Sequence, residues 1–388
     1  MTSLQNETPA LDPLGAPDTS EAGYVMEWVI DPANYCSEHE LITRRALAGR
    51  IAGLRGMQYF GPVSRRPPPA GPLYFIPSDT VETHRAQAIG IRSENDFFGG
   101  AVPFAYVATK AITHPLHHPD AACPRDWVES FAPRIGDCVL PGYSAFSEDD
   151  ARLAGRTLLC GGDVRVKPVR ATGGNGQTVV RDAASLDRTL ASVPHMDTDG
   201  VVLERNLREA RTLSIGQVKV GALTMSYYGL QRLTRNHRGH WVYGGSDLTA
   251  VRGGFDALNA MPLKPSLRLA VEQAAVYHAA VVESYPGFMA SRINYDVAQG
   301  PDDAGHWCSG VLEQSWRVGG ATGAEVAALE HFAAKPRSRR VRASTFEVYD
   351  RDGGAPPQAD VYFQGTDPQA GPLLKYALLH HDDDDNKA

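Results

Sequence analysis

Residues 164–180 read VRVKPVRATGGNGQTVV, and this stretch says more about the fold than any other part of the chain. A run of strand-forming residues reaches Lys167, glycines follow at Gly173, Gly174 and Gly176, and a second strand-forming run begins at once. Glycines let backbone N–H groups approach an anion closely, because no Cβ stands in the way. The ammonium group of Lys167 can place a positive charge on a phosphate. The stretch therefore predicts a phosphate-covering loop between two antiparallel strands.

The order of elements separates this loop from two other phosphate-binding loops. A dinucleotide-binding loop runs from a strand through GxGxxG into a helix, whereas a strand follows the glycines here. A Walker loop has its lysine after the glycines, whereas Lys167 precedes them. An ordinary hairpin with a glycine turn fits the segment equally well. The loop alone therefore leaves phosphate binding and a plain hairpin open.

The composition is that of a soluble globular protein. The chain has 388 residues, 43% hydrophobic and 21% charged, which suggests two or three domains. Its net charge of −7 offers no general basic field, so nucleic acid is not an expected partner. The five cysteines are scattered without CxxC spacing, which fits a reducing, cytoplasmic setting without zinc or disulfides. A signal-peptide pattern and a run of roughly 18 apolar residues are both missing, so we expect no membrane association.

Alternating strand and helix patterns divide the chain into α/β and α+β lobes. The polar stretch 1–22 predicts a disordered tail, and Ser37 with Glu40 predicts a capping box at the start of a helix. We expect an α/β lobe over 23–105, two further lobes over 106–200 and 201–334, and a short β extension with an acidic tail over 335–388.

Two late strands carry polar side chains on common faces, because residues i and i+2 of a strand point the same way. The residues concerned are Arg292, Asn294 and Asp296 on one strand and Glu313, Ser315 and Arg317 on the other. Mg²⁺ prefers hard oxygen ligands and shares them with substrate phosphates. Arginines nearby can neutralise charge on a transferred phosphoryl group. Two exposed edge strands with solvated side chains are the alternative, but the convergence of oxygens and arginines favours a site.

In their order along the chain, these features resemble those of the ATP-grasp superfamily, over about residues 105–325. The chain resembles an uncharacterised bacterial branch in the phrases FGGAVPFAYVATKAITHPL, GLQRLTRN, YGGSDL and LEQSWRVGGA, and is distantly similar to D-alanine–D-alanine ligase and biotin carboxylase. The resemblance implies a fold in which the two α+β subdomains, 106–200 and 201–334, clasp ATP. It also implies a chemistry in which a carboxylate activated as an acyl phosphate is attacked by an amine or a similar nucleophile.

The resemblance assigns roles residue by residue. The residues expected to bind ATP are Lys110, Lys167, Gly173, Gly174, Gly176, Gln177, Glu204 and Leu207. The segment VVLERNL at 201–207 resembles the hinge between the subdomains, with Glu204 accepting from the adenine amine region and Leu207 packing on the ring.

The expected ligands of one or two Mg²⁺ ions are Asn294, Asp296, Glu313 and Ser315, and the expected catalytic residues are Arg292 and Arg317. The family pattern has an aspartate where Asn294 stands and an asparagine where Ser315 stands, and Asp296 can restore the lost carboxylate. The ribose-contacting acid of many relatives falls near Arg211, with Glu209 as the nearest acid.

The resemblance thus implies an ATP- and Mg-dependent ligase for small-molecule carboxylate and amine substrates, and it allows a homodimer. A kinase on the same fold is one alternative. A non-catalytic nucleotide-binding regulator is another, motivated by Asn294 and Ser315.

Three other stretches have weaker patterns. The segment 241–254, with Ser246, Asp247 and Arg252, fits an acceptor site or a plain hairpin equally well. The histidines around His114 predict a solvated loop or helix-end contact rather than a metal site, and 335–342 predicts a solvated linker.

Overall fold

The computed structural model describes residues 23–31, 37–63, 68–170, 176–349 and 354–380. The predicted disordered tail (1–22), Gly173, Gly174 and the acidic C-terminal residues lie outside these ranges. Within the described ranges, no helix has the length and apolar character needed to cross a membrane.

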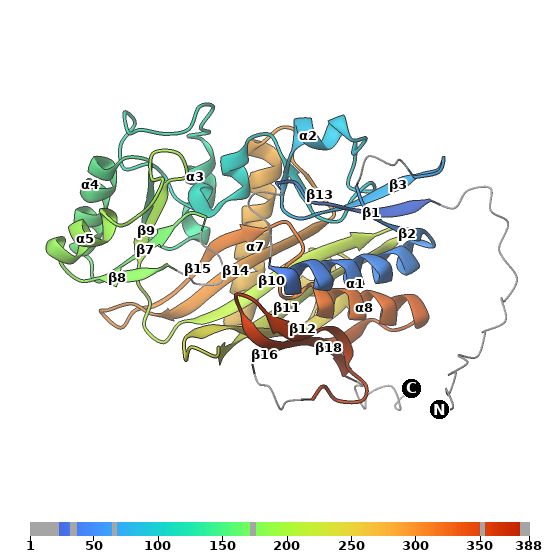
Figure 1. Cartoon of the computed structure of the whole chain (residues 1–388). Helices are drawn as coiled ribbons and strands as arrows, with labels where there is room; N and C mark the ends of the chain where they lie inside the picture. Colours follow the sequence, from blue (N-terminus) through green and yellow to red (C-terminus); the bar gives the residue numbers. More distant parts are fainter. Residues whose placement is uncertain (1–22, 32–36, 64–67, 171–175, 350–353, 381–388) are drawn as a thin grey trace, which may run out of the picture.

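The first lobe is a small parallel sheet with one long helix against it (Figure 1). Strand β1 (Tyr24–Trp28) lies between β2 (Gln58–Pro62) and β3 (Leu73–Pro77). Helix α1 (Glu38–Arg55) begins at the predicted capping box, where the Glu40 carboxylate accepts from the Ser37 backbone N–H at 3.2 Å. The remaining elements are β4 (Val81–Glu82), α2 (Thr83–Ala88) and β5 (Gly100–Val102), and β5 pairs with β13 (Met289–Ala290).

Short helices connect this lobe to the central one. They are the 3-10 helices η2 (Ala105–Ala108), η3 (Lys110–Thr113) and η4 (Gly136–Cys138), and α3 (Phe131–Ile135).

The central lobe is a four-stranded sheet covered by two helices. Its strand order is β6 (Gly142–Ala145), β9 (Val201–Arg205), β7 (Val164–Pro168) and β8 (Thr178–Val180). The helices are α4 (Glu148–Leu159) and α5 (Ala183–Leu190), whose apolar residues share one core with the strands. Strands β7 and β8 are antiparallel, as predicted for the two strands that flank the glycine loop.

The largest element is an eight-stranded sheet. Its order is β15 (Trp307–Ser315), β14 (Arg292–Pro301), β10 (Arg211–Val220), β11 (Leu223–Arg235), β12 (Trp241–Arg252), β16 (Arg340–Val348), β18 (Gly371–His380) and β17 (Asp360–Asp367). The strands after residue 335 therefore continue the sheet of the third lobe. The domain boundaries as such stay predictions.

Helices cover both faces of this sheet (Figure 1). Helices α6 (Phe255–Asn259) and α7 (Pro265–Ser284) pack on one face, where Ile215 and Tyr295 share their core. Helices α1 and α8 (Thr322–Ala334) pack on the other, where Tyr227 and Leu248 share theirs. Because successive strand residues point to opposite faces, the central strands β10 and β12 contribute to both cores.

Helix α8 was not expected from the sequence. Its residues are buried on nearly every side, so it lacks the one-sided apolar pattern by which surface helices are recognised. It carries Glu325, whose side chain is fully buried. This helix turns out to support the candidate site.

Candidate functional site

Strands β14 and β15 bring the predicted metal ligands together on the face of the large sheet that α8 covers. In this antiparallel pair, Asn294 lies opposite Ser315 and Asp296 lies opposite Glu313. On the other side of β14, Gly216 of β10 pairs with Asn294. The four predicted ligands thus form one patch, built from residues that alternate along each strand.

The two carboxylates of this patch are suited to a cation. Asp296 Oδ1 accepts hydrogen bonds from Asn294 Nδ2 at 2.9 Å and from Ser214 Oγ at 3.2 Å. Burial raises the pKa of Asp296, and the negative charge of Glu313 raises it further. Two carboxylates held face to face repel each other, and a hard cation between them relieves that repulsion. The donor set of the patch therefore fits Mg²⁺.

Lys110 joins this patch from a distant part of the chain. Its Nζ lies 2.7 Å from Oε2 of Glu313, and the Lys110 side chain is only 5% exposed. The next residue along β15, Gln314, explains how η3 is held there. Gln314 Nε2 donates to the carbonyl oxygens of Val107 at 3.0 Å and Thr109 at 2.7 Å. The backbone that carries Lys110 is therefore fastened to the strand that carries Glu313.

The predicted ligands Asn294 and Ser315 also have partners within the protein. Arg292 Nη1 donates to the Ser315 backbone oxygen at 3.0 Å and lies 3.3 Å from its Oγ. The Tyr227 hydroxyl lies 2.9 Å from Asn294 Oδ1 and 2.6 Å from Glu325 Oε1. Their roles as metal ligands stay predictions, and Asp296 and Glu313 are the stronger candidates.

The two predicted catalytic arginines differ in their surroundings. Arg292 is buried, and its Nε and Nη2 both bind the Glu325 carboxylate. Arg317 is partly exposed, and its Nε lies 3.5 Å from Oδ1 of Asp79 in the first lobe. Arg317 is thus the more accessible of the two, whereas Arg292 is engaged in holding β14, β15 and α8 together.

A second buried lysine lies at the end of β7. Lys167 Nζ is 2.7 Å from Oε2 of Glu204, and His114 Nε2 is 3.2 Å from the same oxygen. Burial alone would raise the pKa of Glu204, but Lys167 and His114 outweigh it and lower that pKa to about 2. The Glu204 carboxylate is therefore already engaged, and its expected contact with the adenine amine region stays a prediction.

We predicted a solvated loop or a helix-end contact for these histidines. The solvated loop is wrong for His114, which lies at the end of η3. This side chain is fully buried, and a Cβ at Gly142 would lie only 2.7 Å from its ring. His118 Nε2 lies 2.9 Å from Oδ1 of Asp150. In the described part of the chain, no three histidine, cysteine, aspartate or glutamate side chains gather as a metal site. The proline-rich segment around His114 suggested an exposed loop. Its partner Glu204 lies 90 residues further along the chain, so no local sign of the burial is present in the sequence.

Leu207 belongs to a small apolar cluster. It is 6% exposed and contacts Leu140, Ala298 and the partly buried Leu312. The register of β14 and β15 shifts so that Asp296 pairs with Glu313 while Val297 pairs with Val311, which leaves Leu312 unpaired in a bulge. Neither Leu140 nor Leu312 was expected from the sequence, because alternation does not reveal the bulge at Leu312 and Leu140 lies outside the strands.

The described end of the glycine loop is connected to the hinge. Gly176 has a φ of 68°, which favours glycine. Gln177 Oε1 accepts from Arg165 Nη1 at 3.3 Å, and Arg165 Nη2 donates to Asn206 Oδ1 at 2.7 Å. Gln177 and the hinge thus share one arginine, while Gly173 and Gly174 lie outside the described residues.

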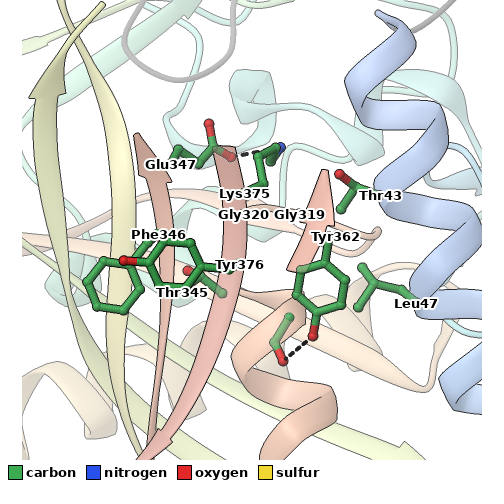
Figure 2. Close-up of a pocket in the computed structure, with 11 residues that line it drawn as sticks. Thr43, Leu47, Gly319, Gly320, Thr345, Phe346, Glu347, Tyr362, Lys375 and Tyr376 are labelled. Carbon is green, nitrogen blue, oxygen red and sulfur yellow. Dashed lines mark hydrogen bonds and ion pairs between the residues drawn. The ribbon is translucent and has the colours of Figure 1, made fainter. Parts of the chain in front are cut away.

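A pocket with about 290 Å³ of empty space, part of it open to solvent, adjoins the patch. Figure 2 shows it between α1, the start of α8 and the C-terminal strands, with Glu347 and Lys375 paired at 2.8 Å on its wall. Gly319 belongs to this wall, and a Cβ there would lie 3.9 Å from both Ser315 Oγ and Arg292 Nη2. The pocket therefore lies next to the predicted ligand Ser315.

The segment 241–254 does not bring its polar residues to one place. Ser246 lies within 2.7 Å of the Tyr243 hydroxyl, on the face of the predicted ligands. Asp247 lies on the opposite face and binds Ser344. Arg252 donates to backbone oxygens at the end of α8. A shared role of these residues in one acceptor site has no support in this arrangement.

Comparisons with known proteins agree with the architecture. N5-carboxyaminoimidazole synthetase from Staphylococcus aureus, complexed with ADP, is similar with a TM-score of 0.50 and 12% identity, over 94% of this chain and 95% of that one. Carboxyaminoimidazole ribonucleotide synthase from Aspergillus clavatus, complexed with ATP, is similar with a TM-score of 0.51 and 10% identity, over 93% and 94% of the two chains. At such identities the likeness shows the fold, and the predicted ATP-grasp fold is confirmed.

Comparison with curated proteins gives no match. A family model described as protein of unknown function DUF3182 matches residues 29–377, and the chain therefore belongs to this family.

Proposed function

We propose that this protein is an ATP- and Mg²⁺-dependent ligase that activates a carboxylate as an acyl phosphate for attack by an amine or similar nucleophile. The observation that carries the proposal is the contact of Lys110 with the patch of predicted ligands. The carboxylates of Asp296 and Glu313 lie on opposite residues of two paired strands, beside a buried ammonium. Carboxylates suit Mg²⁺, and an ammonium suits a phosphate oxygen. An ATP-grasp fold that holds both in one place is equipped to bind a magnesium nucleotide.

The nucleotide would extend from this patch toward the hinge. Lys167, oriented by Glu204 at 2.7 Å, would bind phosphate at one side of the site. The apolar cluster of Leu140, Leu207 and Leu312 offers a surface for the adenine ring. Leu312 directly precedes Glu313 in the bulge of β15. Leu312 would contact the adenine ring, and Glu313 would bind the metal.

The chemistry would proceed in two displacements. A carboxylate oxygen of the substrate attacks the γ-phosphorus of ATP, and ADP leaves. The amine then attacks the acyl carbon, phosphate leaves, and the amine proton is lost to solvent. Bound Mg²⁺ would supply neutralisation of the phosphate charges. Arg317 would stabilise the charge that grows on the transferred group, and Lys110 would hold a phosphate oxygen. Positioning and electrostatics, rather than a protein nucleophile, would provide the rate.

A non-catalytic nucleotide-binding regulator is the second candidate. Two of the four predicted metal ligands, Asn294 and Ser315, already contact Tyr227 and Arg292 within the protein. With fewer oxygens left for metal, nucleotide binding without turnover would follow. A kinase reaction on a hydroxyl would use the same residues as the ligase, and only the products distinguish the two.

The test begins with ATP and ADP binding to the full chain by calorimetry, with and without Mg²⁺. Phosphate release is then measured across a panel of carboxylic acids, each combined with a panel of amines. We expect Mg-dependent ATP binding, and ADP, phosphate and an amide for the matching pair. Glu313→Ala should abolish turnover, whereas the exposed control Glu129→Gln should leave it unchanged.

The outcomes separate the candidates. A phosphorylated acceptor in place of an amide would establish the kinase reaction. Tight ATP binding with no turnover for any pair would favour the regulator. Failure of both nucleotides to bind would overturn the proposal as a whole.

A further inference from the structure

We infer that Lys110 makes the metal position of this site depend on the nucleotide, so that a divalent cation binds well only together with phosphate. This inference rests on the proposed function, and it concerns the order and coupling of ligand binding. It follows from the 2.7 Å contact between Lys110 Nζ and Glu313 Oε2, which places a buried ammonium on a carboxylate that the cation needs.

The first step is that Lys110 cannot easily leave. Its side chain is 5% exposed, so moving the ammonium away from Glu313 would break an ion pair that is already removed from water. The backbone on both sides is also restrained. Gln314 binds the carbonyl oxygens of Val107 and Thr109, and the Thr109 hydroxyl accepts from the Ala111 N–H. Lys110 is thus held against β15 by the residue next to Glu313.

The second step is the charge balance of the patch. Asp296 and Glu313 contribute two negative charges when ionised and Lys110 contributes one positive charge, while Arg292 is matched separately by Glu325. A bare divalent cation would have to share Glu313 with the ammonium beside it, and the two would repel. A phosphate group removes this conflict, because the ammonium can bind a phosphate oxygen while Glu313 turns to the cation.

Bound phosphate therefore makes Glu313 available to the cation, and a bound cation makes Lys110 available to the phosphate. Such coupling is reciprocal by thermodynamic necessity, so metal should raise nucleotide affinity by the same factor by which nucleotide raises metal affinity. Lys167 provides the contrast. It is equally buried, but its partner is Glu204, which lies in the hinge and not in the carboxylate patch. Removing Lys167 should weaken nucleotide binding without changing how the cation binds alone.

The experiment uses Mn²⁺ as a spectroscopic probe for the cation, with free Mn²⁺ measured by electron paramagnetic resonance on the full chain. Titrations are made with and without a non-hydrolysable ATP analogue, for the wild type, Lys110→Met and Lys167→Met. Methionine keeps much of the length of lysine without its charge. Lys110→Gln serves as a second variant if Lys110→Met does not fold, as judged by circular dichroism.

In the wild type we expect the analogue to tighten Mn²⁺ binding at least tenfold. In Lys110→Met we expect Mn²⁺ alone to bind at least tenfold more tightly than to the wild type, with the analogue adding little. Lys167→Met should bind Mn²⁺ alone like the wild type.

Equal Mn²⁺ affinities of the wild type and Lys110→Met without nucleotide, alongside intact nucleotide binding, would overturn the coupling and leave the proposed function standing. Failure of the wild type to bind any nucleotide would overturn the proposed function itself. An equal gain in Lys167→Met would also contradict the inference, because the effect would then come from overall charge.

Discussion

Arg292 and Glu325 form an ion pair in the interior of the protein, with Nη2 and Oε1 2.7 Å apart and both side chains at most 2% exposed. Arg292 is the first residue of β14. Its side chain reaches Glu325 on helix α8 and also donates to the backbone oxygen of Ser315 on β15. A buried ion pair adds little net stability, because desolvation offsets the attraction, but breaking one half leaves an uncompensated charge. Loss of either partner should therefore disturb the positions of β14 and β15, which carry the candidate site.

The first prediction concerns this support. Glu325→Gln should lower the free energy of unfolding by about 3–5 kcal/mol, because the guanidinium of Arg292 would lose its counter-ion in the interior. Urea denaturation measures the change. The control is Glu330→Gln on the same helix, whose partner Arg50 is partly exposed, and it should cost about 1 kcal/mol or less. Similar losses for the two variants would show that burial of the pair does not govern its importance.

A second prediction sets stability against function at Asp296. Burial and the nearby Glu313 raise the pKa of this carboxyl group in the folded protein. A raised carboxyl pKa costs stability at neutral pH, and the cost disappears as the pH falls through the folded-state value. Asp296→Asn should therefore raise the free energy of unfolding at pH 7.5 by roughly 0.5–2 kcal/mol, and the thermal midpoint should rise with it. The same change should weaken nucleotide-dependent Mn²⁺ binding. Calorimetry and the Mn²⁺ titration give the two readouts. A lower midpoint would mean that the hydrogen bonds from Asn294 and Ser214 outweigh the repulsion.

A third prediction concerns acid stability and Glu204. Its pKa lies at about 2 in the folded protein, against an ordinary value of 4.5. Because the folded value is the lower one, this carboxylate stabilises the protein above pH 4.5 and loses that contribution as the pH falls toward 2. The difference in unfolding free energy between wild type and Glu204→Gln should be on the order of 3 kcal/mol at pH 6 and should shrink below pH 4.5. Denaturant titrations from pH 6 to about pH 3 test this. Parallel pH curves would contradict it.

A fourth prediction tests close packing behind Asn294. A Cβ at Gly216 would lie 2.4 Å from the hydroxyl of Tyr227, which contacts Asn294 and Glu325. Gly216→Ala should destabilise the protein by about 1–3 kcal/mol and weaken nucleotide-dependent Mn²⁺ binding, since Tyr227 must move. The matched control is Gly49→Ala within α1, where a Cβ meets nothing within 4 Å. That change should stabilise the protein by up to about 1 kcal/mol. A harmless Gly216→Ala would show that the sheet can yield at this position.

Local patterns of the sequence determined the parts of the protein whose physics is local. The capping box at Ser37 started α1 where expected, because its hydrogen bonds join residues three apart. The glycine stretch lies between antiparallel strands, and the alternation along β14 placed Asn294 and Asp296 on one face. These features follow from backbone geometry within a few residues, so they could be predicted without knowing the rest of the chain.

Only the tertiary structure decided which distant groups meet. Helix α8 and Glu325 escaped prediction because a helix buried on nearly every side has no polar face to mark its period. The pairings of Lys110 with Glu313 and of His114 with Glu204 join residues that are far apart in the chain, and they leave no periodic trace in the sequence. Buried charges must find counter-ions wherever the folded chain provides them, so the partner of each is fixed by packing across the whole molecule. Strand alternation predicted which residues share the face of the patch, whereas the folded structure placed Lys110 and the Arg292–Glu325 pair beside them.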